Sequence, residues 1–170
     1  MTLLSLVIIT ALIFEFINGF HDVANVVAMP IATKSLSPYQ AIIIAAIFNF
    51  WGAFVSTAVA TTISKGLVDV DIITYLVLIS SLLSAISWNL FTWYFGVPSS
   101  SSHALIGSLI GAASASSFAS IDTIHYEILL GKVILPMMLS PILAFLVALV
   151  LVVILFKILN RFKTPRKSNA

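Results

Sequence analysis

The eight residues from Asn18 to Asn25, NGFHDVAN, decide the class of this protein, because they place polar and ionisable side chains inside an otherwise apolar run. An aspartate at the centre of a membrane-spanning helix costs about 2.5–3.5 kcal/mol on insertion scales. Such residues are usually kept where something must bind or move. A second polar stretch, PSSSSH from Pro98 to His103, interrupts a later apolar run. Two polar stretches at membrane depth indicate a path for a solute.

The composition is that of an integral membrane protein. Of the 170 residues, 61% are hydrophobic and 8% are charged, whereas a soluble domain carries about 25% charged residues. The net charge of +2 comes from basic residues in loops and in the C-terminal tail, so it does not indicate a nucleic-acid partner. The sequence has no cysteine, which excludes disulfides and thiolate metal sites. We expect a lipid bilayer around the chain and neither a cofactor nor a bound metal.

Apolar stretches predict an all-α fold with about five membrane-spanning segments, since a helix of about 20 residues crosses the hydrocarbon. Four segments cover roughly residues 3–28, 39–62, 72–96 and 131–156. The fifth, 98–118, is rich in serine and glycine, and we expect a crossing by a discontinuous helix, with a re-entrant hairpin as the alternative. These segments form a transmembrane domain over residues 1–156.

The loops and the tail predict the orientation. Pro30 and Thr33–Ser35 form the first predicted loop. The chain ends in a basic segment, 157–170, which we expect to be cytoplasmic because positive residues near span ends stay inside. Five crossings then place the N-terminus outside. The predicted location is the plasma membrane, which is the inner membrane of a bacterium that has two.

One stripe of polar residues is predicted on the first span. Glu15, Asn18, Asp22 and Asn25 are three, four and three residues apart, a spacing that places them on one face of a continuous helix. Gly19 would let this helix loosen or let another backbone approach closely. Oxygen ligands suit a hard cation or a proton rather than a soft metal. His21 lies beside the stripe and is the natural proton-linked group, because histidine changes charge near neutral pH.

The serine stretch predicts an anion site at a helix N-terminus. Pro98 suits the start of a helix, which would place Ser99, Ser100, Ser101 and Ser102 in the cap and first turn. Unpaired N–H groups and the helix dipole favour an oxyanion such as phosphate there. The bland alternative is a serine cap at a water interface. Asn49 and His103 are possible neighbours of the site, and Asn89 is expected to serve helix packing.

The two polar stretches together resemble the signature and the serine-rich broken helix of the PiT-type inorganic phosphate transporters. The segments IFNF at 47–50 and WNLFTWYFG at 88–96 are similar to the bacterial branch of that family. The resemblance covers nearly the whole chain. It implies a low-affinity carrier of inorganic phosphate, built from two related halves of inverted topology, and therefore not an enzyme.

The resemblance also implies site roles. Asp22 and Asn25 would serve the coupling ion and the substrate, and Ser100, Ser101 and Ser102 would contact phosphate. Bacterial members are similar in having histidine at the position of His21, where sodium-coupled members have asparagine. We therefore expect symport with H⁺ rather than Na⁺, with a neutral metal–phosphate complex as one form of the cargo.

The length departs from the family, whose members carry a second Asn-Asp signature in a second half. We expect an N-terminal half that works with a partner, which is either a second half or another copy in opposite orientation. The basic segment then resembles the start of the linker between halves. An inactive or purely structural truncated subunit is one alternative. An intramembrane hydrolase is disfavoured, because no Gly-x-Ser-x-Gly elbow and no zinc helix occur.

Overall fold

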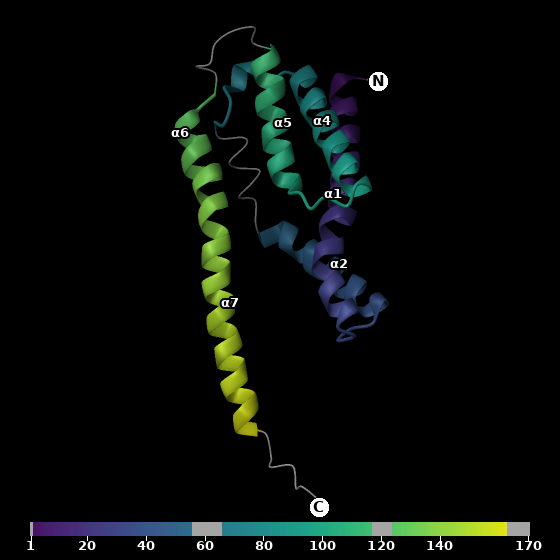
Figure 1. Cartoon of the computed structure of the whole chain (residues 1–170). Coiled ribbons are helices and arrows are strands. Elements are labelled where there is room, and N and C mark those ends of the chain that lie inside the picture. Colours follow the sequence, from purple (N-terminus) through teal and green to yellow (C-terminus); the bar gives the residue numbers. More distant parts are fainter. Residues whose placement is uncertain (1, 56–65, 117–123, 163–170) are drawn as a thin grey trace, which may run out of the picture. The chain divides into compact units, whose positions relative to one another are not determined.

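The computed structural model describes residues 2–55, 66–116 and 124–162, and it is helical almost throughout (Figure 1). The long helices are α1 (Leu3–Ala32), α2 (Pro38–Val55), α4 (Tyr75–Tyr94), α5 (Ser101–Ser116) and α7 (Leu135–Phe162). Short elements are η1 (Val70–Ile72), α6 (Tyr126–Leu129) and the π-helical turn η3 (Leu130–Ile134). The described residues form no strand beyond one isolated bridge, between Val68 and Ile124. The predicted all-α class is confirmed.

Four helical stretches are long and apolar enough to cross a membrane. They are α1, α2, α4 and the continuous stretch Tyr126–Arg161. Helix α5 has 16 residues and is therefore about 24 Å long at 1.5 Å per residue, shorter than a hydrocarbon core of about 30 Å. The serine-rich segment is thus the short member of a set of five helices, and its last two predicted residues, 117–118, lie outside the described part of the chain.

Helix α1 is longer than predicted, and the placement of Pro30 in a loop is wrong. The helix continues to Ala32, because a proline this close to the C-terminus removes only one hydrogen bond of the last turn. The chain then closes the helix with two backbone bonds, from Lys34 N–H to the Ile31 carbonyl and from Ser35 N–H to the Pro30 carbonyl, each 3.0 Å. Helix α1 also runs unbroken through Gly19, and nothing lies within 4 Å of a Cβ placed there, so among the described residues the structure shows neither the predicted loosening nor a close backbone approach.

A capping box starts α2, as its sequence Ser37-Pro38-Tyr39-Gln40 would require. The Ser37 backbone N–H donates to Gln40 Oε1 at 3.1 Å, and the Gln40 N–H donates to Ser37 Oγ at 3.3 Å. Pro38 occupies the first helical position, where its missing N–H has no cost. The last seven residues of the predicted span, 56–62, lie outside the described residues.

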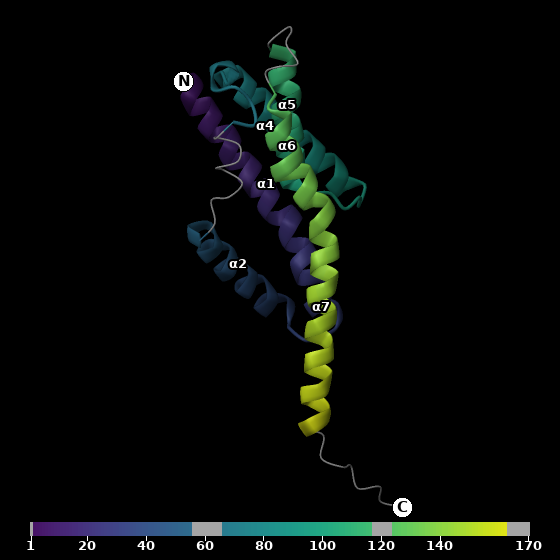
Figure 2. The ribbon, with the colours of Figure 1, turned by 90° about the vertical axis from the view of Figure 1, so that its left-hand side faces the viewer.

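Helix α4 packs against both α1 and α5, and α2 packs on α1, as the two perpendicular views show (Figures 1 and 2). The centre of this packing is a buried cluster of Phe14 and Ile17 on α1 with Leu82, Ala85 and Ile86 on α4. Both sets follow the 3,4 spacing of a single helix face. This packing fixes the position along the helices at which the two polar stretches meet.

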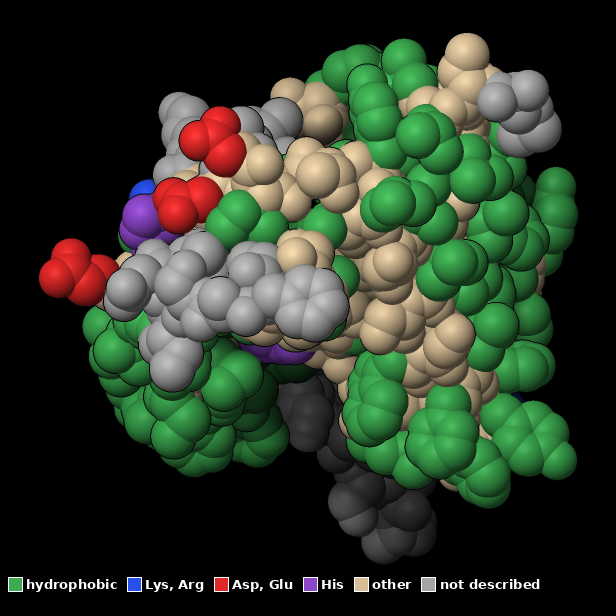
Figure 3. Space-filling view, turned by 90° about the horizontal axis from the view of Figure 1, so that it is seen from above, with side chains coloured by type: hydrophobic (Ala, Val, Ile, Leu, Met, Phe, Trp, Pro, Cys, Tyr) green, Lys and Arg blue, Asp and Glu red, His purple; other side chains and the backbone are tan. Residues whose placement is uncertain are grey.

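The chain divides into two compact units, Met1–Tyr126 and Glu127–Ala170. Hydrophobic side chains cover much of the face seen in Figure 3. In the second unit, the described side chains of α7 are exposed, which is the surface expected of a helix made for lipid or for other helices. Helix α7 continues past residue 156 through Lys157 and Arg161.

Candidate functional site

The turn after α4 sets the course of the serine stretch. Gly96 has φ +65°, and two backbone bonds close the helix end: Gly96 N–H to the Trp93 carbonyl at 3.1 Å and Val97 N–H to the Thr92 carbonyl at 2.9 Å. This pair of bonds is a Schellman motif, which normally places glycine in the left-handed region. The motif turns the chain so that the segment 97–100 runs back toward α1.

A matched pair of glycine variants tests this turn. Gly96→Ala is expected to destabilise the chain by about 1–2 kcal/mol, because an L-residue is strained in the left-handed region, although open space surrounds the site of the added Cβ. Gly107→Ala in the middle of α5, which also has open space, is expected to stabilise by about 0.5–1 kcal/mol through helix propensity. Thermal unfolding in detergent measures both. Shifts of the same sign would contradict this reading of the turn.

Helix α5 begins at Ser101, so the predicted placement of Pro98 at the helix start is wrong. Ser100 is the capping residue. Its carbonyl accepts the Ala104 N–H at 3.0 Å, and its Oγ accepts the His103 N–H at 3.4 Å. Ser101 and Ser102 occupy the first turn, whereas Pro98 and Ser99 belong to the linker that leaves the Schellman turn.

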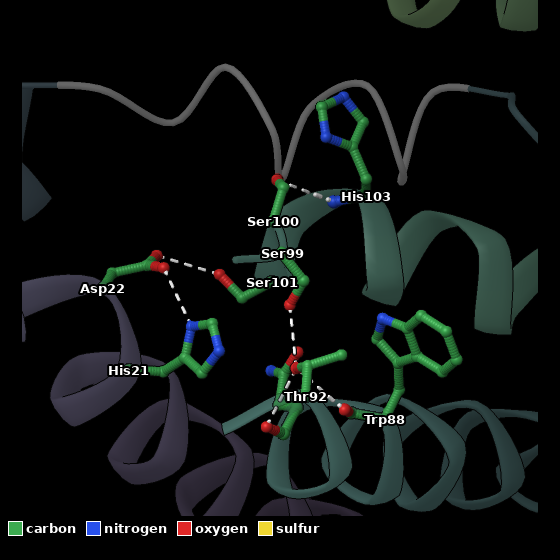
Figure 4. Close-up of polar contacts among 9 residues, drawn as sticks. His21, Asp22, Trp88, Thr92, Ser99, Ser100, Ser101 and His103 are labelled. Carbon is green, nitrogen blue, oxygen red and sulfur yellow. Dashed lines mark hydrogen bonds and ion pairs between the residues drawn. The ribbon is translucent and has the colours of Figure 1, made fainter. Parts of the chain in front are cut away.

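The two polar stretches meet at one hydrogen bond. Ser101 Oγ on α5 donates to Asp22 Oδ2 on α1 at 2.8 Å, across 79 residues of sequence (Figure 4). Ser101 is buried, while the Asp22 side chain is 50% exposed. The carboxylate therefore lies at the N-terminal end of α5 and keeps an open side toward a ligand or a partner.

His21 is buried next to this contact. Its side chain is 6% exposed, and its Nδ1 lies 3.5 Å from Asp22 Oδ1 (Figure 4). The predicted proton-linked group and the predicted coupling carboxylate are thus direct neighbours. A charge on the imidazole would act on Asp22 at short range, because Coulomb attraction between groups this close is only partly screened inside a protein.

Thr92 joins the site, although no sequence argument selected it. Its Oγ1 lies 2.9 Å from Ser99 Oγ and donates to its own helix, at the Trp88 and Asn89 carbonyls. An open pocket of about 160 Å³ adjoins it, lined by His21, Ala24, Asn25, Thr92, Trp93, Gly96, Val97 and Pro98. The sequence feature that could have selected Thr92 is its position in an apolar span, one turn after Asn89. Asn25 meets the linker from α4 in this pocket.

The predicted polar stripe of α1 divides between two places. Glu15 does not join Asp22; it lines a separate open pocket of about 500 Å³ with Phe48, Asn49, Gly52 and Ala53 of α2. Asn49 Nδ2 donates to the Ala45 carbonyl of its own helix at 2.9 Å. Asn49 is therefore a neighbour of Glu15, not of the serine stretch.

The other predicted residues have different surroundings. Asn18 Oδ1 is buried without a hydrogen-bond partner among the described residues. Ser102 and His103 are exposed, and the His103 ring points away from Asp22 (Figure 4). A hydrolase would need a histidine base on its serine, but Ser101 donates to a carboxylate instead. No three His, Asp or Glu side chains of the described residues come together as metal ligands.

The arrangement combines an anion site with a carboxylate. The first turn of α5 offers backbone N–H groups, serine hydroxyls and the positive end of the helix dipole, which together suit an oxyanion. Asp22 lies at the same helix end. An ionised Asp22 would repel an anion by about 4 kcal/mol at a separation of about 4 Å in an effective dielectric of about 20. Anion binding there is therefore favoured when a proton or a cation neutralises Asp22.

Residues 18–170 match the phosphate transporter family. The chain is 48% identical over 143 residues to a probable low-affinity inorganic phosphate transporter of Streptomyces halstedii, covering 83% of this chain and 65% of the relative. It is 47% identical over 167 residues to a protein of the same description in Bacillus subtilis, covering 95% and 49%. A low-affinity inorganic phosphate transporter of Buchnera aphidicola is 42% identical over 158 residues, covering 87% and 32%.

These relatives are longer than this chain, which spans about half to two thirds of the first two. No solved structure matches the chain.

Proposed function

The chain belongs to the phosphate transporter family, and from this premise we propose that it forms one half of a membrane carrier for inorganic phosphate. The observation that carries the proposal is the hydrogen bond from Ser101 to Asp22, because it joins an anion-binding helix end to an ionisable group. A broken or shortened helix whose N-terminus faces an anionic substrate is a recurrent device of carriers. Membership of a transporter family agrees with the expectation that the chain is not an enzyme.

We assign phosphate to the N-terminal end of α5. Ser99, Ser100, Ser101 and Ser102 supply hydroxyl and backbone donors there, and Asn25 approaches from α1 through the pocket that it shares with the linker. Helix α5, Ser101–Ser116, carries no lysine or arginine. Neutral donors and a helix dipole hold an anion less tightly than fixed cations would, which suits a carrier that must release its cargo.

Proton symport follows from the carboxylate at the same place. When Asp22 is ionised, it accepts the hydrogen bond of the Ser101 hydroxyl, so that this donor is not free for phosphate. Its negative charge also repels phosphate. Protonation of Asp22, or of the adjacent His21, removes that repulsion and lets the anion bind. Phosphate uptake should then fall when the pH gradient is collapsed at constant membrane potential. Unchanged uptake would contradict proton coupling. Uptake that depends on Na⁺ would favour sodium as the coupling ion.

A second half completes the site. Asp22 is half-exposed, and Glu15 and Asn25 are exposed on a helix long enough to cross the membrane. Polar groups facing lipid are costly, and carriers with inverted repeats place their sites where the repeats meet. We propose that the face of Asp22 and Asn25 contacts that second half, which is the remainder of a longer chain, a separate chain or another copy. The basic tail lies in the cytoplasm and the N-terminus outside, in the plasma membrane.

Radiolabelled phosphate uptake tests the proposal in cells that lack their own phosphate carriers. The chain is expressed alone and together with the C-terminal part of the Bacillus subtilis relative, at matched membrane levels. Uptake only in the second case is expected for one half of a carrier. Uptake by the chain alone would mean that copies of it assemble into a carrier. A well-inserted chain without uptake in either case would contradict the proposal.

A further inference from the structure

Thr92 holds the linker between α4 and α5 at two points. Its backbone carbonyl accepts the Val97 N–H at 2.9 Å, and its Oγ1 lies 2.9 Å from Ser99 Oγ (Figure 4). Thr92 is 1% exposed, so water does not compete for these contacts. One buried threonine therefore fixes both the course of the linker and the position of the Ser99 hydroxyl.

The contacts of the Thr92 hydroxyl determine the direction of its bond with Ser99. Thr92 Oγ1 lies 3.0 Å from the Trp88 carbonyl oxygen and 3.1 Å from the Asn89 carbonyl oxygen. Carbonyl oxygens only accept, and a threonine hydroxyl has a single proton. If that proton pointed to Ser99, Oγ1 would face two carbonyl oxygens with no proton between them. The proton is therefore shared by the two carbonyls, and Ser99 donates to Thr92.

The serine stretch consequently presents both kinds of hydrogen-bonding group. Ser99 is half-buried, and with its proton bound to Thr92 its oxygen acts on any further partner as an acceptor. Ser100 differs, because its Oγ accepts the His103 N–H at 3.4 Å and its own proton bonds to none of the described residues. The first N–H groups of α5 are further donors. A ligand that satisfies this end of the helix must accept several hydrogen bonds and donate one.

This requirement distinguishes between tetrahedral oxyanions. Inorganic phosphate and arsenate keep at least one O–H group near neutral pH, whereas sulfate keeps none. Sulfate would place a negatively charged oxygen against the lone pairs of Ser99. A site that is built to bond an O–H group of its ligand rejects an analogue without that group, because the polar group of the site is left unpaired.

We propose that Ser99 accepts a hydrogen bond from the O–H group of phosphate, and that Thr92 is a positioning residue that keeps the Ser99 hydroxyl in this orientation. The pair makes the carrier select oxyanions that carry an O–H group against sulfate. The inference rests on the proposed function, since it needs phosphate at the N-terminal end of α5. Thr92 also lines the pocket of about 160 Å³ together with Asn25, which we assign to phosphate as well.

Competition measurements test the inference in the assembly that transports phosphate. The inhibition of radiolabelled phosphate uptake by unlabelled sulfate is compared with its inhibition by unlabelled arsenate. In Thr92→Val the side chain keeps its shape, but the Ser99 proton loses its acceptor and can turn to the ligand. Sulfate should then inhibit about tenfold more strongly relative to arsenate. Thr92→Ser keeps the hydroxyl and should retain the native ratio.

Two further variants show whether Thr92 acts through Ser99. Ser99→Ala removes the acceptor and should also lower the discrimination against sulfate. Adding Thr92→Val to Ser99→Ala should change the ratio no further, because residues that act through one contact are not additive. The control is Thr10→Val on α1, which should keep the native ratio. Thr10 is also buried, and its Oγ1 donates to the Leu6 carbonyl at 2.8 Å, in its own helix.

Three results would overturn the inference while leaving phosphate transport in place. One is equal inhibition of the native assembly by sulfate and arsenate, a measurement that needs no variant to fold. Another is a native ratio in a Thr92→Val assembly that still transports phosphate. The third is a further change when Thr92→Val is added to Ser99→Ala. Absence of phosphate uptake by the native assembly would instead contradict the proposed function, and this inference with it.

Discussion

Replacing Asp22 with asparagine is expected to lower phosphate uptake by about 100-fold while the chain still folds and inserts. Asparagine keeps the shape of the side chain and an oxygen that can accept from Ser101, but it can neither take up a proton nor carry the charge that the proton removes. Hydrogen bonds to charged groups contribute about 1.5–3 kcal/mol, and each 1.4 kcal/mol is a factor of ten. The measurement is initial uptake at matched membrane levels, in the assembly that transports.

The control is Asp69→Asn. Asp69 is also an aspartate with one close partner, His125 Nε2 at 3.0 Å, but it lies in the loop before α4 and about half of its side chain is exposed. Surface pairs of this kind contribute about 0–1 kcal/mol, so uptake should stay near that of the native chain. If Asp22→Asn retained half of the native uptake, the carboxylate would have no part in transport and the proposed coupling would be wrong.

Removing the Ser101 hydroxyl is expected to reduce the apparent affinity for phosphate by about 10- to 100-fold. Ser101→Ala removes one of the donors that we assign to phosphate, and the loss of a hydrogen bond to a charged group costs about 1.5–3 kcal/mol. It also deletes the donor to Asp22. The variant should raise KM for phosphate in uptake measurements, with little change in membrane level, because the residue sits in the first helical turn and alanine is a good helix former.

Two variants separate this effect from a general loss of packing. Ser101→Thr keeps the hydroxyl and should recover part of the affinity. Ser87→Ala removes a hydroxyl that bonds within α4 and should leave KM unchanged. A Ser101→Ala chain with native KM would show that the contact between Ser101 and Asp22 is a structural cap only.

The sequence by itself determined the membrane class, the helical segments and the two polar stretches, because hydropathy and charge are local properties of a chain. The PSSSSH stretch also predicted a helix start, although a proline within a few residues of a helix is a weak marker of its exact first residue. The predictions of a helix end at Pro30 and a loosened helix at Gly19 failed for a similar reason. Each residue weakens the helix only locally, and the other residues of α1 keep it continuous.

Only the tertiary structure decided which polar residues meet. The distance between Asp22 and Ser101 depends on the left-handed turn at Gly96, which is local, and on α4 packing between α1 and α5, which is not. Packing also gives Glu15 and Asp22 different neighbours, α2 and α5, although both lie on one stripe of the unbroken helix α1. It buries Asn89 and Thr92 of α4. The spacing of residues along one helix predicts which side chains share a face. The helices that pack against that face determine what each side chain contacts.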